Sequence, residues 1–156
     1  MSELIGRVLE HWCRNDAAPS TPCTVEQIRK FERRERVTAP DDLRRFFLAA
    51  NGMNLGFRLG KDAEGFAFWH LDDLVRADAE LERRSPSSAR PENSEDLYAF
   101  ADYMDWSWAY AIRLRGNGLG SVVLIGGDGV VPCVAKSFTE FLERYLSDSM
   151  SLFPRR

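Results

Sequence analysis

The sequence predicts an α+β fold with an antiparallel or mixed sheet of about six strands and helices packed on one side. Apolar residues recur at three- and four-residue spacing in the first third of the chain and again near its C-terminus, as in amphipathic helices. Between these regions, apolar and polar residues alternate in short runs separated by turn residues, as in half-buried strands. Because the connections between neighbouring runs are short, we expect antiparallel pairing.

Length and composition narrow the class of protein. The 156 residues suffice for one domain, which we expect to cover residues 1–156. The chain is 44% hydrophobic and 29% charged with a net charge of −3, so it lacks the basic excess typical of nucleic-acid-binding proteins. Three cysteines are widely spaced, and no apolar run approaches the roughly 18 residues that span a bilayer. We therefore expect a cytoplasmic protein with reduced thiols and neither a membrane nor a nucleic-acid partner.

Three helices are expected in the first third of the chain, at about residues 2–15, 24–36 and 40–51. The second opens on a Thr-Val-Glu-Gln capping box. The third ends before Gly52, since glycine readily takes the left-handed conformation that closes a helix. The polar side of the second helix is rich in arginine, which we interpret as a solvated face; binding of nucleic acid through this helix is the alternative.

A hairpin is expected between strands at 55–59 and 66–70, because Leu55, Phe57 and Leu59 alternate with glycine and arginine. An amphipathic helix is expected to follow at about 71–83. The remaining expected elements are four strands and a last helix with a capping box at its start: strands 97–103, 106–114, 121–125 and 130–135, the last two joined by a Gly-Gly-Asp-Gly turn, and a helix from Ser137.

The aromatic-rich stretch DYMDWSWAYAIRL, residues 102–114, is the clearest candidate for a functional surface. Alternation along a strand places its large residues on one face, which we assign to the core: Trp106, Trp108, Tyr110, Ile112 and Leu114. The same alternation leaves a polar remainder for contact with a partner, to which we add one tryptophan of the expected hairpin: Trp69, Asp102, Tyr103, Asp105 and Arg113. A strand turned the other way would instead expose the tryptophans as binding anchors.

Residues for catalysis are sparse. The two histidines, His11 and His70, are far apart and have no second histidine or cysteine at metal-binding spacing. His70 beside Asp72 or Asp73 could serve as the base of a small hydrolase, but acidic residues there also suit the first turn of a helix. We therefore expect no enzyme activity, no metal site and no cofactor, with the hydrolase centred on His70 as the alternative.

Four segments, in this order, resemble the SUKH superfamily, which includes the yeast Smi/Knr cell-wall regulators and many bacterial immunity proteins of polymorphic toxin systems. They are IRKFERRERVTAPDDLRRFFLAANGM, FAFWHLDDLVR, FADYMDWSWAYAIRL and VVPCVAKSFTEFLERYL. The resemblance covers about residues 25–146. It departs from the usual pattern at Ala39, where leucine is common, at Leu43, where an aromatic residue is common, and at YMDWSW, which replaces a glycine-rich turn.

The resemblance implies a SUKH-like fold and a role in binding rather than in catalysis. It implies a protein partner, most simply a cognate toxin that the chain neutralises as an immunity protein. A regulatory scaffold of the same superfamily is the alternative within this reading. The resemblance implies neither a cofactor nor turnover.

Overall fold

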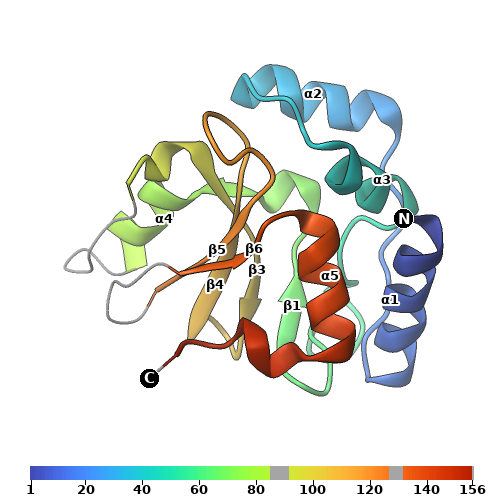
Figure 1. Ribbon diagram of the computed structural model, residues 1–156. Coiled ribbons are helices and arrows are strands. Elements are labelled where there is room, and N and C mark those ends of the chain that lie inside the picture. The colour runs from blue at the N-terminus through green and yellow to red at the C-terminus, as the bar shows by residue number, and fades with distance from the viewer. Residues whose placement is uncertain (85–91, 127–131, 156) are drawn as a thin grey trace.

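The computed structural model describes residues 1–84, 92–126 and 132–155, and these form five α-helices around a six-stranded sheet (Figure 1). The helices are α1 Ser2–Arg14, α2 Val25–Glu35, α3 Asp41–Ala49, α4 Ala77–Arg84 and α5 Phe138–Ser147. The strands are β1 Phe66–Phe68, β2 Val75–Arg76, β3 Leu97–Tyr103, β4 Trp108–Arg113, β5 Val122–Ile125 and β6 Cys133–Ala135. Three short 3-10 helices complete the described elements: η1 Leu71–Asp73, η2 Ser94–Asp96 and η3 Ser149–Leu152. The predicted α+β class is confirmed.

The sheet has the order β1-β3-β4-β5-β6, and every described pair of strands is antiparallel. Strands β1 and β2 share one edge of β3: Phe66 pairs with Tyr103, and Val75 pairs with Ala99 further along the strand. The register between β3 and β4 shifts at Phe100, a bulge that bends β3 between its two short neighbours. The short strands β1 and β2 together therefore form one edge of the sheet.

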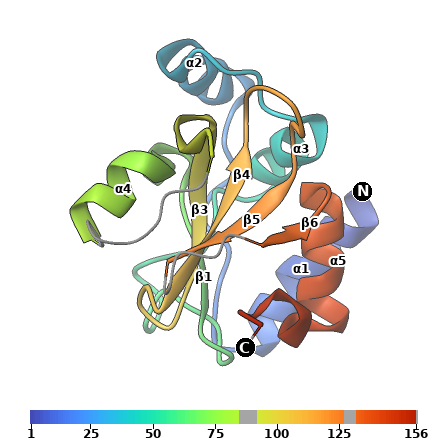
Figure 2. The ribbon, with the colours of Figure 1, turned by 60° about the vertical axis from the view of Figure 1, so that its left-hand side comes forward.

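The main core lies between one face of the sheet and helices α1, α3 and α5. Phe46 of α3, Phe68 of β1 and Phe138 of α5 are almost fully buried there. The rings of Phe46 and Phe138 meet edge to face at 5.2 Å between centroids, a favourable geometry for aromatic pairs. Helix α4 departs from the expected packing on one side, because it lies across the sheet from α1 and α5 (Figure 2). It closes a second, smaller cluster that includes Ala77 and Ala111.

The helix ends follow the local sequence closely. The predicted capping box of α2 is present: Gln27 N donates to Thr24 Oγ1 at 3.2 Å, and Thr24 N donates to Gln27 Oε1 at 2.8 Å. At α5 only half of the predicted box forms. Glu140 N donates to Ser137 Oγ at 3.0 Å, but the Glu140 carboxylate accepts from Lys136 N at 2.6 Å instead.

The predicted hairpin is wrong. Residues 55–59 form turns rather than a strand, and β1 pairs with β3. The cause is local, because the Asn54 side chain accepts a hydrogen bond from Gly56 N at 2.9 Å and Phe57 N donates to Asn54 O at 3.1 Å. Arg58 then takes a positive φ of 53°. A segment bent in this way cannot present a straight edge to β1, whatever the alternation of its side chains.

Other predicted boundaries also shift. The helix expected at 71–83 is divided into η1, β2 and α4. The strand expected from 106 begins at Trp108, and the strand expected at 130–135 is seen as β6 from Cys133. Residues 130–131 of that strand and most of the Gly-Gly-Asp-Gly turn lie outside the described residues.

Candidate functional site

Asp102 joins two tryptophans at the end of the sheet. Trp69 Nε1 donates to Asp102 Oδ2 at 2.7 Å, and Trp106 N donates to Asp102 Oδ1 at 3.1 Å. The two indole rings stack with centroids 5.5 Å apart and planes 21° apart. The guanidinium of Arg84, the last residue of α4, lies over the Trp106 ring at 4.4 Å from its centroid, within range of a cation–π interaction. The carboxylate thus fixes the tryptophans, and α4 covers one of them.

The prediction that Trp106 shares a face with Trp108 is wrong. Met104, Asp105 and Trp106 have φ values of 47°, 53° and 70°, so the chain makes a left-handed turn before β4 begins. This turn carries Trp106 to the side of the sheet that holds Ala109 and Ala111, where it packs against the smaller cluster. The rest of the assignment is confirmed, because Trp108, Tyr110, Ile112 and Leu114 all pack in or against the main core.

Tyr103 and Asp105 lie on either side of this turn. Tyr103 is half-buried on the core side of the sheet, where its ring stacks on Trp108 at 4.5 Å and contacts Phe153 at 4.8 Å. Asp105 is exposed and accepts from Lys61 Nζ at 2.8 Å. Met104 between them donates through its backbone N to Gly65 O at 2.9 Å. The β3–β4 turn is therefore bonded to the segment that precedes β1.

Arg113 does not join the other four predicted contact residues. It stands at the opposite end of β4, where its Nη1 lies 3.5 Å from Asn93 O. There it lines an open cavity of about 460 Å³ with Asp96 and Gly116 among the other walls. The structure thus brings Trp69, Asp102, Tyr103 and Asp105 together and leaves Arg113 apart.

Four apolar side chains near this turn are exposed, and three of them, Leu55, Phe57 and Leu59, belong to a segment that the sequence assigned to a strand. Leu55, Phe57, Leu59 and Met104 are 59%, 40%, 81% and 51% exposed. Figures 1 and 2 both place segment 54–65 beside the β3–β4 turn at one end of the sheet. Segment 54–65, residues 102–107 and Trp69 together form a surface that we call the sheet-end surface. Within it is a cavity of about 510 Å³ whose walls include Leu59, Lys61 and Met104.

A buried carboxylate holds segment 54–65 in place. Asp62 Oδ1 accepts from Phe66 N at 2.9 Å and from Glu64 N at 3.0 Å, and Oδ2 accepts from the Tyr145 hydroxyl of α5. Burial raises the pKa of Asp62, although the hydrogen bond from Tyr145 opposes this effect. Burial also raises the pKa of Tyr145 far above its usual value, which keeps its hydroxyl protonated as the donor.

Three further contacts fix the rest of the segment. Ala63 N donates to Asn15 O at 2.7 Å, which ties the segment to the end of α1. Arg58 pairs with Asp16 at 2.9 Å, and Lys61 pairs with Asp105 at 2.8 Å. The apolar side chains therefore face solvent from a backbone that is anchored at several points, and the neighbouring charges neutralise one another. The glycines at 56, 60 and 65 were the sequence signal for such a turning segment.

The geometry around His70 does not support the hydrolase alternative. His70 Nε2 lies 2.9 Å from Ser20 Oγ and 2.9 Å from Met53 O. A carbonyl oxygen can only accept, so Nε2 carries the hydrogen and cannot act as a base toward Ser20. Asp72 is exposed and lies 3.7 Å from Arg34. Within the described residues no hydrogen bond joins the His70 ring to Asp72 or Asp73.

Among residues 1–84, 92–126 and 132–155, no group of three or more histidine, cysteine, aspartate or glutamate residues could hold a metal ion. None of the helices described is both long enough and apolar enough to cross a membrane.

The sequence also matches a known protein family. Residues 22–144 match the sequence model of the SMI1/KNR4 family (SUKH-1). The chain belongs to the SMI1/KNR4 family. The resemblance drawn from the four sequence segments is thereby confirmed. The matched range begins before α2, contains the six described strands and ends within α5, so the sheet-end surface lies inside it and α1 lies outside it. No curated protein matched this SMI1/KNR4 family chain.

Proposed function

We propose that this SMI1/KNR4 family protein is a non-enzymatic, cytoplasmic immunity protein that binds and neutralises one cognate protein toxin through its sheet-end surface. Proteins of the SUKH superfamily are typically toxin immunity proteins, which supports a protein partner. The choice of surface rests on one observation, a group of exposed apolar side chains on an anchored backbone: Leu55, Phe57, Leu59 and Met104. A fixed apolar patch on an otherwise well-packed chain is characteristic of a protein-binding site.

The surface has the composition of a protein interface. Leu59 and Met104 both line the cavity and supply apolar area, and burying one such side chain contributes about 1.5–3 kcal/mol. Tyr103 stands beside them, and aromatic residues are frequent anchors of protein interfaces. Lys61 lines the same cavity and pairs with the exposed Asp105, and such interface charges direct encounter more than they add affinity. Arg113 would reach the same partner only if the interface extended along the whole sheet.

Trp69 and Asp102 take a supporting role in this proposal. Asp102 uses both oxygens to hold Trp69 and the backbone of Trp106, so it positions the turn that carries Met104 and Asp105. A toxin would then meet a turn that is already ordered, and little conformational entropy would be lost on binding.

The gene beside this one is the first place to look for the cognate toxin, and a toxin domain found there is the probe for the test. Co-expression of the wild-type chain should protect cells from the toxin domain, and the two purified proteins should form a complex measurable by calorimetry. Leu59→Asp places a charge at the most exposed apolar side chain of the surface, so it should weaken binding by roughly ten- to a hundredfold without affecting folding.

Leu119→Asp is the matched control, because Leu119 is also exposed, at 52%, but lies in the loop after β4 at the opposite end of the sheet. It should bind the toxin domain as the wild type does. Absence of any complex and of any protection would contradict the immunity function. Equal binding by the wild type and Leu59→Asp, with loss in Leu119→Asp, would move the interface to the other end of the sheet.

A further inference from the structure

Asp62 is a buried carboxyl group without a cationic partner among the described residues. Its three hydrogen bonds come from two backbone amides and the Tyr145 hydroxyl, and all three donors are neutral. Burial raises the pKa of Asp62, and the neighbouring Glu64 carboxylate adds to this effect. An aspartate as buried as this one is usually paired with a cation. The ionised form of Asp62 therefore lacks its usual counter-charge.

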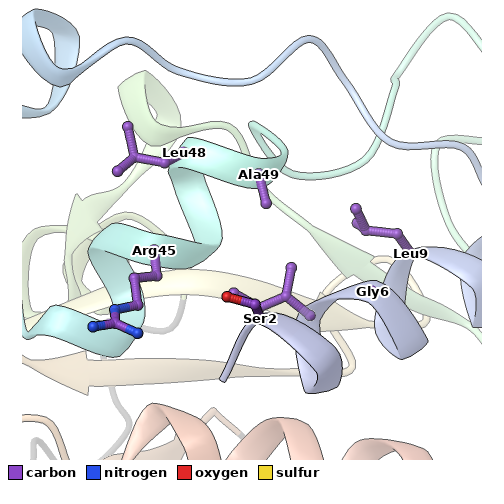
Figure 3. A pocket seen from close by; sticks show the side chains of 7 residues that line it. Ser2, Gly6, Leu9, Arg45, Leu48 and Ala49 are labelled. Atoms are coloured by element: carbon purple, nitrogen blue, oxygen red, sulfur yellow. The ribbon is translucent and has the colours of Figure 1, made fainter.

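Asp62 is also one of the residues that line the cavity of about 510 Å³ in the sheet-end surface. Leu59 and Met104 add apolar walls to the same cavity. The cavity between α1 and α3, of about 320 Å³, is different (Figure 3). Arg45 in its lining is exposed and already paired with Asp41, so that cavity has no buried charge that would select an occupant.

The charges around the first cavity favour a cation over an anion. Arg58 pairs with Asp16 at 2.9 Å and Lys61 pairs with Asp105 at 2.8 Å, so both cations in the lining are already neutralised. Asp62 and its neighbour Glu64 are the carboxyl groups left over. Two cations thus stand beside four carboxyl groups at this place: Asp16, Asp62, Glu64 and Asp105.

His11 does not supply the missing positive charge. Its ring contacts the Tyr145 ring, and its Nε2 lies 3.9 Å from Glu64 Oε1. Asn15 Nδ2 donates to His11 O at 2.7 Å and lies 3.3 Å from His11 Nδ1. An amide nitrogen can only donate, so Nδ1 accepts and the imidazole is neutral.

We propose that the cavity of the sheet-end surface receives a lysine or arginine side chain of the toxin, with its aliphatic part against Leu59 and Met104 and its charged end beside Asp62. This assignment rests on the proposed function, because it names the part of the toxin that the surface binds. Lysine and arginine combine an apolar stem with a charged end, as these walls require. Asp62 Oδ2 accepts a single hydrogen bond, and a carboxylate oxygen has room for two.

Titration with n-butylguanidinium chloride at neutral pH tests the site without a toxin. This probe has the stem and the charge of an arginine side chain. It should shift the amide NMR signals of Ala63 and Gly65 in the wild type and saturate in the millimolar range. n-Butanol has the same stem without the charge, and butyrate has the opposite charge, so both should bind more weakly. A wild type that does not respond to n-butylguanidinium, or that responds more strongly to butyrate, overturns the proposal.

Asp62→Asn removes the charge and keeps the fold, because the asparagine oxygen can accept from the same two amides and its nitrogen can donate to Tyr145. It should weaken n-butylguanidinium binding roughly tenfold or more. Asp73→Asn is the matched control, since it makes the same change at an exposed residue of η1, whose neighbour Asp72 pairs with Arg34 of α2. It should bind the probe as the wild type does. Equal binding by Asp62→Asn and the wild type overturns the proposal.

The toxin domain then tests which side chain enters the cavity. Asp62→Asn should weaken the complex roughly tenfold or more, and Asp73→Asn should leave it unchanged. One lysine or arginine of the toxin should weaken the wild-type complex when replaced by alanine and have no further effect on the Asp62→Asn complex. A complex indifferent to Asp62→Asn overturns this proposal and leaves the immunity function standing. Absence of any complex contradicts the immunity function, and n-butylguanidinium bound through Asp62 would then assign the cavity to a cationic side chain of another protein.

Discussion

Asp62 is a single residue on which the shape of the sheet-end surface depends. The residue is 4% exposed, and its carboxylate accepts hydrogen bonds from two backbone amides and the Tyr145 hydroxyl at once. Burial holds its pKa above the ordinary value of 3.8. Since the folded state then binds the proton more tightly than the unfolded chain does, the stability contributed by Asp62 falls as pH rises from about 4 through the raised folded-state pKa.

Asp62→Asn tests whether this contribution to stability falls as pH rises, because asparagine keeps the shape of the side chain but does not titrate. The free energy of unfolding of the wild type minus that of Asp62→Asn should fall as pH increases from 4 and level off above the folded-state pKa. Urea unfolding across this range measures the difference. Glu3→Gln is the control: Glu3 is exposed near the start of α1, so this variant makes the same change from carboxylate to amide without touching the buried hydrogen bonds of Asp62. A difference that rose with pH for Asp62 would mean that the hydrogen bonds outweigh burial and lower the pKa.

At the scale of elements, the β3–β4 turn should depend on Asp102 and not on its neighbouring carboxylate. Asp102→Ala leaves Trp69 Nε1 without its acceptor and frees Trp106 N, so we expect a loss of about 1–3 kcal/mol in unfolding free energy. The near-ultraviolet circular dichroism of the stacked indoles should weaken. Asp105→Asn keeps a residue that tolerates the left-handed backbone and removes only the charge that pairs with Lys61, so it should cost at most about 1 kcal/mol with the spectrum unchanged. Equal losses in both variants would contradict the supporting role of Asp102.

This turn, like segment 54–65, has a backbone conformation that could not be predicted from the sequence. Helices α1, α2, α3 and α5 were predictable because their apolar stripes are local patterns, and side-chain caps from Thr24 and Ser137 add to this at α2 and α5. The conformation of segment 54–65 was not predictable, because the alternation of apolar residues gives the spacing of side chains and not the direction of the backbone. The hydrogen bond from Gly56 N to the Asn54 side chain bends the chain there. Trp106 was misplaced for a related reason, since three successive positive φ values reverse the alternation on which its assignment relied.

At the scale of the molecule, the candidate site depends on contacts between distant parts of the sequence. Lys61 and Asp105 are 44 residues apart, and Trp69 and Asp102 are 33 apart, yet each pair is joined by a hydrogen bond. Sequence reasoning could name three of these four residues, because exposed tryptophan and acidic residues are recognisable candidates. It could not show that Arg113, on the same strand as Trp108, lies at the far end of the sheet. Alternation assigns a face to a residue but not a position along the sheet.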